Sequence, residues 1–125
     1  MASIDRDFTI IVDGQPISNP RGDDDRIHAE AGSDAAVFSL RDSRLQSGDW
    51  FLGRFAIEDR SLMPKRVYWF KAGSDEEHNI QPVHARQKGE SYELRFSDAP
   101  LVILDGKLFA TLLDEPRQPV QIKLQ

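Results

Sequence analysis

The sequence predicts an all-β domain of the β-trefoil class, because its apolar segments are short and alternating and because it contains an internal repeat. Almost every apolar segment alternates with polar residues, is rich in β-branched or aromatic residues, and ends at turn residues. The tetrapeptide Ala-Gly-Ser-Asp occurs at residues 31–34 and again at residues 72–75, 41 positions later. Three units of this length nearly fill the 125 residues, and three units of about four short strands describe a β-trefoil.

The similarity between the two units extends beyond the tetrapeptide. Residues 31–55 and 72–96 share eight identities over 25 positions without a gap. Outside the tetrapeptide, the identical pairs are Gln46 with Gln87, Gly48 with Gly89, Arg54 with Arg95, and Phe55 with Phe96. This agreement favours a duplication over a generic β-sandwich with a coincidental tetrapeptide, which is the alternative.

The third unit has to be assembled from both ends of the sequence. With the same offset, Lys107–Leu113 falls on Arg66–Ala72, and Val120–Leu124 falls on a strand of the preceding units. The third unit then lacks its last strand. We expect Phe8–Val12 to supply it, because closing the ring removes the free sheet edges that an all-β protein must otherwise protect.

Ten strands are expected in order along the chain. They are Phe8–Val12, Arg26–Ala31, Ala36–Arg41, Asp49–Ile57, Arg66–Ala72, Asn79–Arg86, Ser91–Phe96, Leu101–Leu104, Lys107–Leu113 and Val120–Leu124. The turn signal Asp105-Gly106 predicts a two-residue hairpin, since both positions can adopt positive φ. Leu108–Leu113 is also compatible with a short helix that ends before Pro116.

The composition describes one domain over residues 1–125 and disfavours several kinds of partner. The net charge of −5 argues against nucleic acid as the partner. The chain has no cysteine, which rules out disulfides and fits a reducing compartment. No apolar run approaches the roughly 18 residues of a membrane span, and Met1–Asp7 does not resemble a secretion signal. We therefore expect a cytoplasmic monomer.

No pattern for catalysis, a metal or a cofactor is recognisable in the sequence. No serine lies in a Gly-x-Ser-x-Gly elbow. The histidines His28, His78 and His84 share no metal-ligand spacing. The acidic clusters at residues 23–25 and 75–77 lack the spacing of a calcium loop and are expected to be solvated. The sequence therefore predicts a protein that is not an enzyme and binds no metal or cofactor.

Residues 57–66 form a candidate binding loop. This segment joins two aromatic-rich strands, is dense in charge, and contains Pro64, which fixes its own φ and restricts Met63. A stiff exposed loop with an arginine or lysine suits a trypsin-like protease, whose S1 pocket has a carboxylate at its base. A loop already in its bound shape also loses little entropy on docking. On these residues alone, a charged loop without a partner is the alternative.

Residues 58–67 (Glu-Asp-Arg-Ser-Leu-Met-Pro-Lys-Arg-Val) closely resemble a segment of the cospin-like serine protease inhibitors of mushrooms (basidiomycetes). Asp105–Leu113 is similar to a second stretch of these inhibitors, so the resemblance covers roughly residues 48–113. It implies a cytoplasmic β-trefoil that inhibits proteases. The resemblance also implies a circular permutation by about one unit relative to the family, since Asp7–Gly14 and Arg26–Arg41 resemble strands that the family carries late in its chain.

The resemblance also implies which residues contact the protease. The trypsin-reactive arginine of the family falls on Arg60, which makes Arg60–Ser61 the expected scissile bond. Glu58 and Asp59 then lie on the non-prime side of this bond, and Ser61 and Leu62 lie on the prime side. Arg60 would enter the S1 pocket and form charge-assisted hydrogen bonds with its carboxylate.

The implied inhibition is substrate-like: the loop binds as a substrate does, and a rigid scaffold keeps the leaving group in place. Lys65 and Arg66 are the fallback candidates for the P1 residue, the one that enters S1. Both are less favoured than Arg60, because Pro64 precedes Lys65 in an already constrained turn and Arg66 is expected to begin the next strand.

The alternative function is a trefoil carbohydrate-binding module, a lectin without inhibitory activity. Trp50, Phe51, Tyr68, Trp69 and Phe70 could line a face on which sugars stack, with acidic turns beside it. In strand alternation Trp50 and Phe51 point in opposite directions, as do Tyr68 and Trp69, so one of each pair is expected in the core. The Gln-x-Trp repeat of ricin-type lectins is absent from the sequence.

Overall fold

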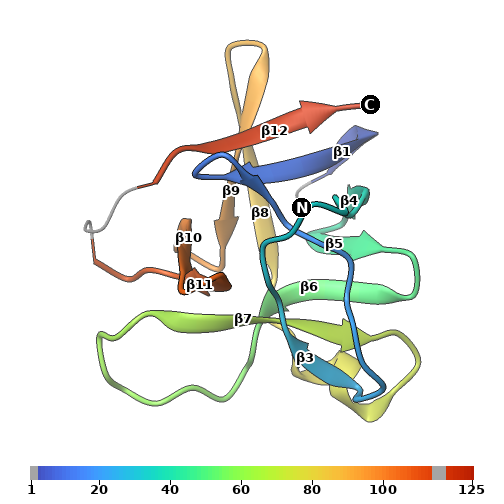
Figure 1. Cartoon of the computed structure of the whole chain (residues 1–125), viewed down its shortest axis with the longest axis vertical. Helices are drawn as coiled ribbons and strands as arrows, with labels where there is room; N and C mark the ends of the chain where they lie inside the picture. The colour runs from blue at the N-terminus through green and yellow to red at the C-terminus, as the bar shows by residue number, and fades with distance from the viewer. Residues whose placement is uncertain (1–2, 114–117) are drawn as a thin grey trace.

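The computed structural model describes residues 3–113 and 118–125, and β-strands form the framework of this part of the chain (Figure 1). The strands are β1 (Ile4–Val12), β2 (Gln15–Pro16), β3 (Arg26–His28), β4 (Phe38–Arg41), β5 (Arg44–Ser47), β6 (Trp50–Arg54), β7 (Lys65–Lys71), β8 (Val83–Lys88), β9 (Ser91–Phe96), β10 (Leu101–Leu104), β11 (Lys107–Ala110) and β12 (Val120–Leu124). A short 3-10 helix, η1 (Asp75–Asn79), follows β7. The prediction of an all-β protein is confirmed.

The strands form one large curled sheet and one separate hairpin. Hydrogen-bonded neighbours follow the order β10-β11-β7-β6-β5-β4-β1-β12, with β2 beside β1 and β3 beside β7. β8 and β9 pair with each other, and β9 also contacts β12 (Figure 1). The first and last strands are antiparallel neighbours from the pair Phe8 with Leu124 to the pair Val12 with Val120.

Two-residue turns with positive φ join several of these strands. Asp105-Gly106 has φ values of 52° and 76° and connects β10 to β11, so the predicted hairpin is confirmed. Asp13-Gly14 joins β1 to β2 in the same way, with φ values of 50° and 78°. The β4–β5 turn uses Asp42-Ser43, with φ values of 52° and 64°. Sequence analysis missed β5 because this turn contains no glycine.

Several predicted strand ends were wrong. Strand β8 begins at Val83, directly after Pro82, rather than at Asn79, which belongs to η1. Strand β6 ends at Arg54 rather than at Ile57. The prediction for Arg26–Ala31 was three residues too long, since β3 ends at His28.

The chain after Ala110 was also predicted wrongly. Strand β11 ends at Ala110 rather than at Leu113, because the Thr111 hydroxyl donates to the Leu113 carbonyl oxygen at 3.0 Å and turns the chain. The alternative of a helix over Leu108–Leu113 is wrong as well, since Lys107–Ala110 is a strand. Pro116, which was expected to end that helix, lies outside the described residues, as do residues 1 and 2 of the N-terminal segment.

The core contains stacked aromatic rings from different strands. The Phe38 and Trp69 rings stack with centroids 5.6 Å apart and planes 2° from parallel, and Phe8 stacks on Phe38 at 6.1 Å. The predicted alternation is confirmed: Phe51 and Trp69 are buried, whereas Trp50 and Tyr68 are partly exposed. The aromatic face expected of a lectin therefore lacks Phe51, Trp69 and Phe70, which are all buried.

Gly53 allows β6 to pass close to the segment that follows η1. A Cβ atom at this position would lie 2.7 Å from Cγ1 and 2.9 Å from Cδ1 of Ile80, and 3.1 Å from the Gln81 carbonyl oxygen. Carbon atoms cannot approach this closely without displacement of the backbone or of Ile80. The glycine therefore sets the distance between β6 and the segment at residues 80–81.

We predict that Gly53→Ala lowers the free energy of unfolding by about 1–3 kcal/mol, because the added methyl group overpacks this contact. Urea denaturation of the purified protein measures the change. The double variant Gly53→Ala/Ile80→Ala should lose less stability than the two single variants together, since removal of the Ile80 side chain makes room. A Gly53→Ala variant as stable as the wild type would contradict the close approach.

Candidate functional site

The loop between β6 and β7, residues 55–64, is fixed to the sheet at its start. The Gln81 amide donates to the Arg54 carbonyl oxygen at 2.9 Å, and the Gln81 side-chain amide donates to the Phe55 carbonyl oxygen at 2.8 Å. The Ala56 amide donates to the Asn79 carbonyl oxygen at 2.6 Å. These bonds hold the first residues of the loop against residues 79–81, the segment that packs closely on Gly53. Figure 1 shows the rest of the loop projecting beyond the strands.

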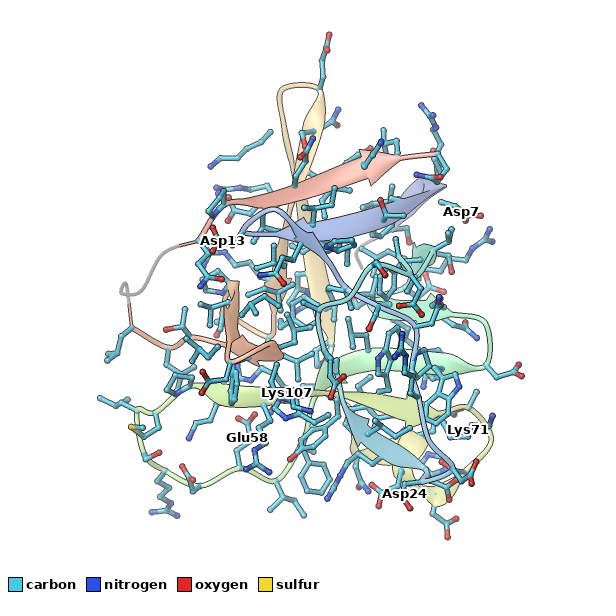
Figure 2. All side chains as sticks on the ribbon, viewed as in Figure 1. Asp7, Asp13, Asp24, Glu58, Lys71 and Lys107 are labelled. Carbon is cyan, nitrogen blue, oxygen red and sulfur yellow. The ribbon has the colours of Figure 1, made fainter. Side chains whose placement is uncertain are left out.

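A buried arginine holds the next part of the loop. Arg54, at the end of β6, is 8% exposed. Its Nε and Nη2 donate to the two carboxylate oxygens of Glu58 at 3.1 and 2.6 Å, and its Nη1 donates to the Phe96 carbonyl oxygen at 3.0 Å. Two parallel bonds of this kind fix both position and orientation. Glu58, labelled in Figure 2, is thereby turned toward the strands and away from solvent.

A buried lysine holds the middle of the loop. The side chain of Lys65, the first residue of β7, is 7% exposed. Its ammonium group donates to the Asp59 carboxylate at 2.6 Å, to the Asp59 carbonyl oxygen at 3.1 Å and to the Ser61 hydroxyl at 3.3 Å. All three N–H bonds of the ammonium group thus have acceptors, and all three acceptors belong to the loop.

Asp59 and Ser61 are also bonded to each other. The Asp59 carboxylate accepts from the Ser61 amide at 3.0 Å and from the Ser61 hydroxyl at 2.6 Å, and the Met63 amide donates to the Ser61 hydroxyl oxygen at 3.3 Å. The hydrogen bond from Lys65, followed by those from Ser61, lowers the pKa of Asp59 to about 2. The carboxylate is therefore charged at every pH above this value, and its bonds are lost only as the pH falls through about 2.

Arg60 lies between the two residues that Lys65 binds, and its own side chain is exposed. No described residue forms a hydrogen bond or ion pair with the Arg60 guanidinium group. The backbone on both sides of Arg60 is fixed through Asp59 and Ser61, while the guanidinium group is available to a partner. This arrangement can present a cation to a pocket that contains a carboxylate.

The other predicted site residues lie in different surroundings. Leu62 is exposed beside Ser61, as expected of a loop that contacts a partner. The fallback candidate Lys65 is buried and fully engaged, so it could reach an S1 pocket only by leaving its three acceptors. Arg66 is exposed, but it lies within β7, paired with Phe109 of β11. These surroundings favour Arg60 over both fallback residues.

Sequence analysis missed the contact between Arg54 and Glu58. Nothing in the loop itself indicates that an arginine before it is buried and bonded to Glu58. Arg54 was visible only as an identity with Arg95 between the two repeat units. The structure gives the two arginines different environments, since Arg54 is buried and Arg95 is exposed and paired with Glu93 at 2.7 Å.

One comparison with known proteins identifies the family of the chain. A family model described as Peptidase inhibitor I66 matches residues 34–125, which include the whole loop and most of the sheet. The chain therefore belongs to the peptidase inhibitor I66 family, and this membership implies an inhibitor of a protease rather than an enzyme. No curated protein and no solved structure matches the chain.

The described residues contain neither a metal-binding cluster nor a membrane-spanning helix. Within residues 3–113 and 118–125, no group of three or more histidine, aspartate or glutamate side chains is placed to hold a metal ion. In the same residues, no helix has the length and apolar character needed to cross a membrane.

We predict that Lys65→Met raises the pKa of Asp59 from about 2 toward the ordinary aspartate value near 3.8, because the bond from Lys65 is the largest cause of the shift. An NMR titration of the carboxylate carbon measures this change. Lys107→Met is the matched control, since Lys107 pairs with Glu30 elsewhere. An unchanged pKa of Asp59 in Lys65→Met would contradict the bond between them.

Proposed function

We propose that this protein is a substrate-like inhibitor of trypsin-like serine proteases that presents Arg60 to the S1 pocket. One observation carries the proposal: Arg60 is an exposed cation whose two neighbours are both tied to the buried ammonium group of Lys65. The S1 pocket of such proteases has a carboxylate at its base, which would accept hydrogen bonds from the guanidinium group. A loop fixed before binding loses little conformational entropy on docking.

The same bonds explain how the loop can resist cleavage. Attack of the protease serine on the Arg60 carbonyl carbon breaks the Arg60–Ser61 peptide bond and frees the amino group of Ser61. In an ordinary substrate this amino group diffuses away, and water then hydrolyses the acyl-enzyme. Here the Ser61 hydroxyl stays bonded to Asp59 and Lys65, so the amino group remains beside the acyl carbon and re-forms the bond.

The proposal includes a β-trefoil fold, which two similar hairpins support. In the β5–β6 hairpin Ser47 pairs with Trp50, and in the β8–β9 hairpin Lys88 pairs with Ser91, 41 positions later. The Gln46 side chain donates to the Gly48 carbonyl oxygen at 2.9 Å, and Gln87 donates to Gly89 at 3.3 Å. The tetrapeptides themselves differ, since Gly73 has a φ of 82° and Gly32 does not adopt positive φ.

We also propose that the order of elements is a circular permutation of a mushroom inhibitor fold. The pairing of β1 with β12 supports this, because a chain whose first and last strands are neighbours can be reordered without loss of a strand pair. The protein would act as a cytoplasmic monomer that binds one protease molecule. The absence of cysteine from the sequence is consistent with that location.

We predict that the wild-type protein inhibits trypsin stoichiometrically and that Arg60→Ala weakens inhibition about 1000-fold, because the central anchor of the interface is lost. Titration of trypsin with a chromogenic substrate measures both. Arg60→Lys should retain inhibition, because lysine also fits an acidic S1 pocket, and Arg66→Ala is the control at the neighbouring exposed arginine. Full inhibition by Arg60→Ala would move the site to another residue.

We further predict that Lys65→Met turns a lasting inhibitor into a temporary one. Without the ammonium group, Ser61 is held less firmly after cleavage, so trypsin should hydrolyse the Arg60–Ser61 bond at least about 10-fold faster. Electrophoresis and mass spectrometry of the complex over time measure the cleaved fraction. Lys107→Met is again the control, and the thermal unfolding of each variant shows whether the fold is retained. Equal cleavage rates in a folded Lys65→Met variant would contradict this role.

A further inference from the structure

Exposed apolar side chains gather in two segments of the chain. Among the described residues, six large hydrophobic side chains are more than a third exposed, and five of them lie in the β6–β7 loop or just after β11. These five are Ile57 at 73%, Leu62 at 64%, Met63 at 68%, Leu112 at 38% and Leu113 at 53%. The sixth, Val37, lies before β4. Apolar residues exposed together mark a surface that a partner covers.

The two segments leave neighbouring strands on the same side of the molecule. Strands β7 and β11 are antiparallel, with Lys65 opposite Ala110. The chain therefore enters β7 from Leu62 and Met63 at the edge where it leaves β11 toward Leu112 and Leu113. Figure 1 shows both segments extending beyond the sheet at the left of the view.

The segment after β11 has a fixed backbone at its start. Thr111 is 4% exposed, and its amide donates to the Pro100 carbonyl oxygen at 3.0 Å. Its hydroxyl donates to the Leu113 carbonyl oxygen at 3.0 Å. The exposure of Leu112 and Leu113 therefore results from a defined turn, and a defined turn can contribute to a preformed binding surface.

The position of this segment relative to the reactive bond follows from the sheet order. Strand β11 is a neighbour of β7 and not of β6. The residues that precede Arg60 lead back to β6, and the residues that follow Ser61 lead into β7. The segment with Leu112 and Leu113 therefore leaves the sheet at the edge where the prime-side residues Leu62 and Met63 lead into β7.

We propose that Leu112 and Leu113 are a second protease-contacting segment, which with Leu62 and Met63 forms one apolar surface against the prime-side wall of a trypsin-like protease. This inference rests on the proposed function. Stable protease–inhibitor complexes bury about 800 Å² on each partner, contributed by about 20–30 residues, so a single short loop does not suffice. The second segment supplies part of the missing contact.

The test compares Leu112→Ser/Leu113→Ser with the wild type in trypsin inhibition. We expect inhibition to weaken about 10- to 100-fold, mainly through faster dissociation, because the variant loses apolar contact and keeps Arg60. Val37→Ser is the matched control, an apolar side chain of similar exposure at 46% that lies outside both segments. Slower hydrogen exchange of the Leu112 and Leu113 amides in the wild-type complex provides a second measurement that needs no variant.

The outcomes separate this inference from the proposed function. If the wild type inhibits through Arg60, and the double variant inhibits equally well with no exchange protection at Leu112 and Leu113, the second contact does not exist. If the double variant instead abolishes a dimer seen by sedimentation without a change in inhibition, the surface binds a second copy of the chain and the inference is wrong. No inhibition by the wild type overturns both proposals.

Discussion

The hydrogen bonds of the Lys65 ammonium group are the constraint on which the β6–β7 loop depends. A buried charge is costly unless it is fully hydrogen-bonded, and the bonded acceptors of this ammonium group are atoms of Asp59 and Ser61. The loop therefore has to bring its middle residues back over the start of β7. Arg54 imposes the same requirement at the end of β6, where Glu58 supplies the acceptors. Two buried cations, one on each flanking strand, thus determine the path of an otherwise exposed segment.

The three basic residues at the loop therefore have different roles. Arg54 and Lys65 are used inside the protein, and their positive charges are compensated by Glu58 and Asp59. Arg60 has no such partner among the described residues and stands between the bonded positions. The described residues therefore leave the charge of Arg60 uncompensated, and in the proposed function this is the charge that the protease binds. The sheet also holds both ends of the loop. Gly53 and Gln81 fix its start, and pairing with β11 fixes Lys65, the first residue of β7 after it.

The sequence predicted features that depend on local chemistry. The Asp105-Gly106 hairpin and the alternation of Trp50 and Phe51 follow from turn residues and strand periodicity, and the structure confirms both. Prediction from the sequence failed where a tertiary contact determines the local structure. The β4–β5 turn lacks glycine, so β5 was not expected. Lys65 is buried and lies opposite Ala110 of β11, and no local pattern shows that these two strands are neighbours. Arg60 itself came from resemblance to known inhibitors rather than from the physics of the loop.

A crystal structure of the complex with trypsin would show which residue enters the S1 pocket and whether the loop keeps its shape there. We expect the Arg60 side chain in the S1 pocket, the Arg60–Ser61 bond at the catalytic serine, and the Lys65 ammonium group still within hydrogen-bonding distance of the Asp59 carbonyl oxygen and the Ser61 hydroxyl. A complex in which trypsin engages another loop would contradict the assignment of Arg60. A complex in which Lys65 has left its acceptors would contradict the view that a buried cation holds the loop in its inhibitory shape.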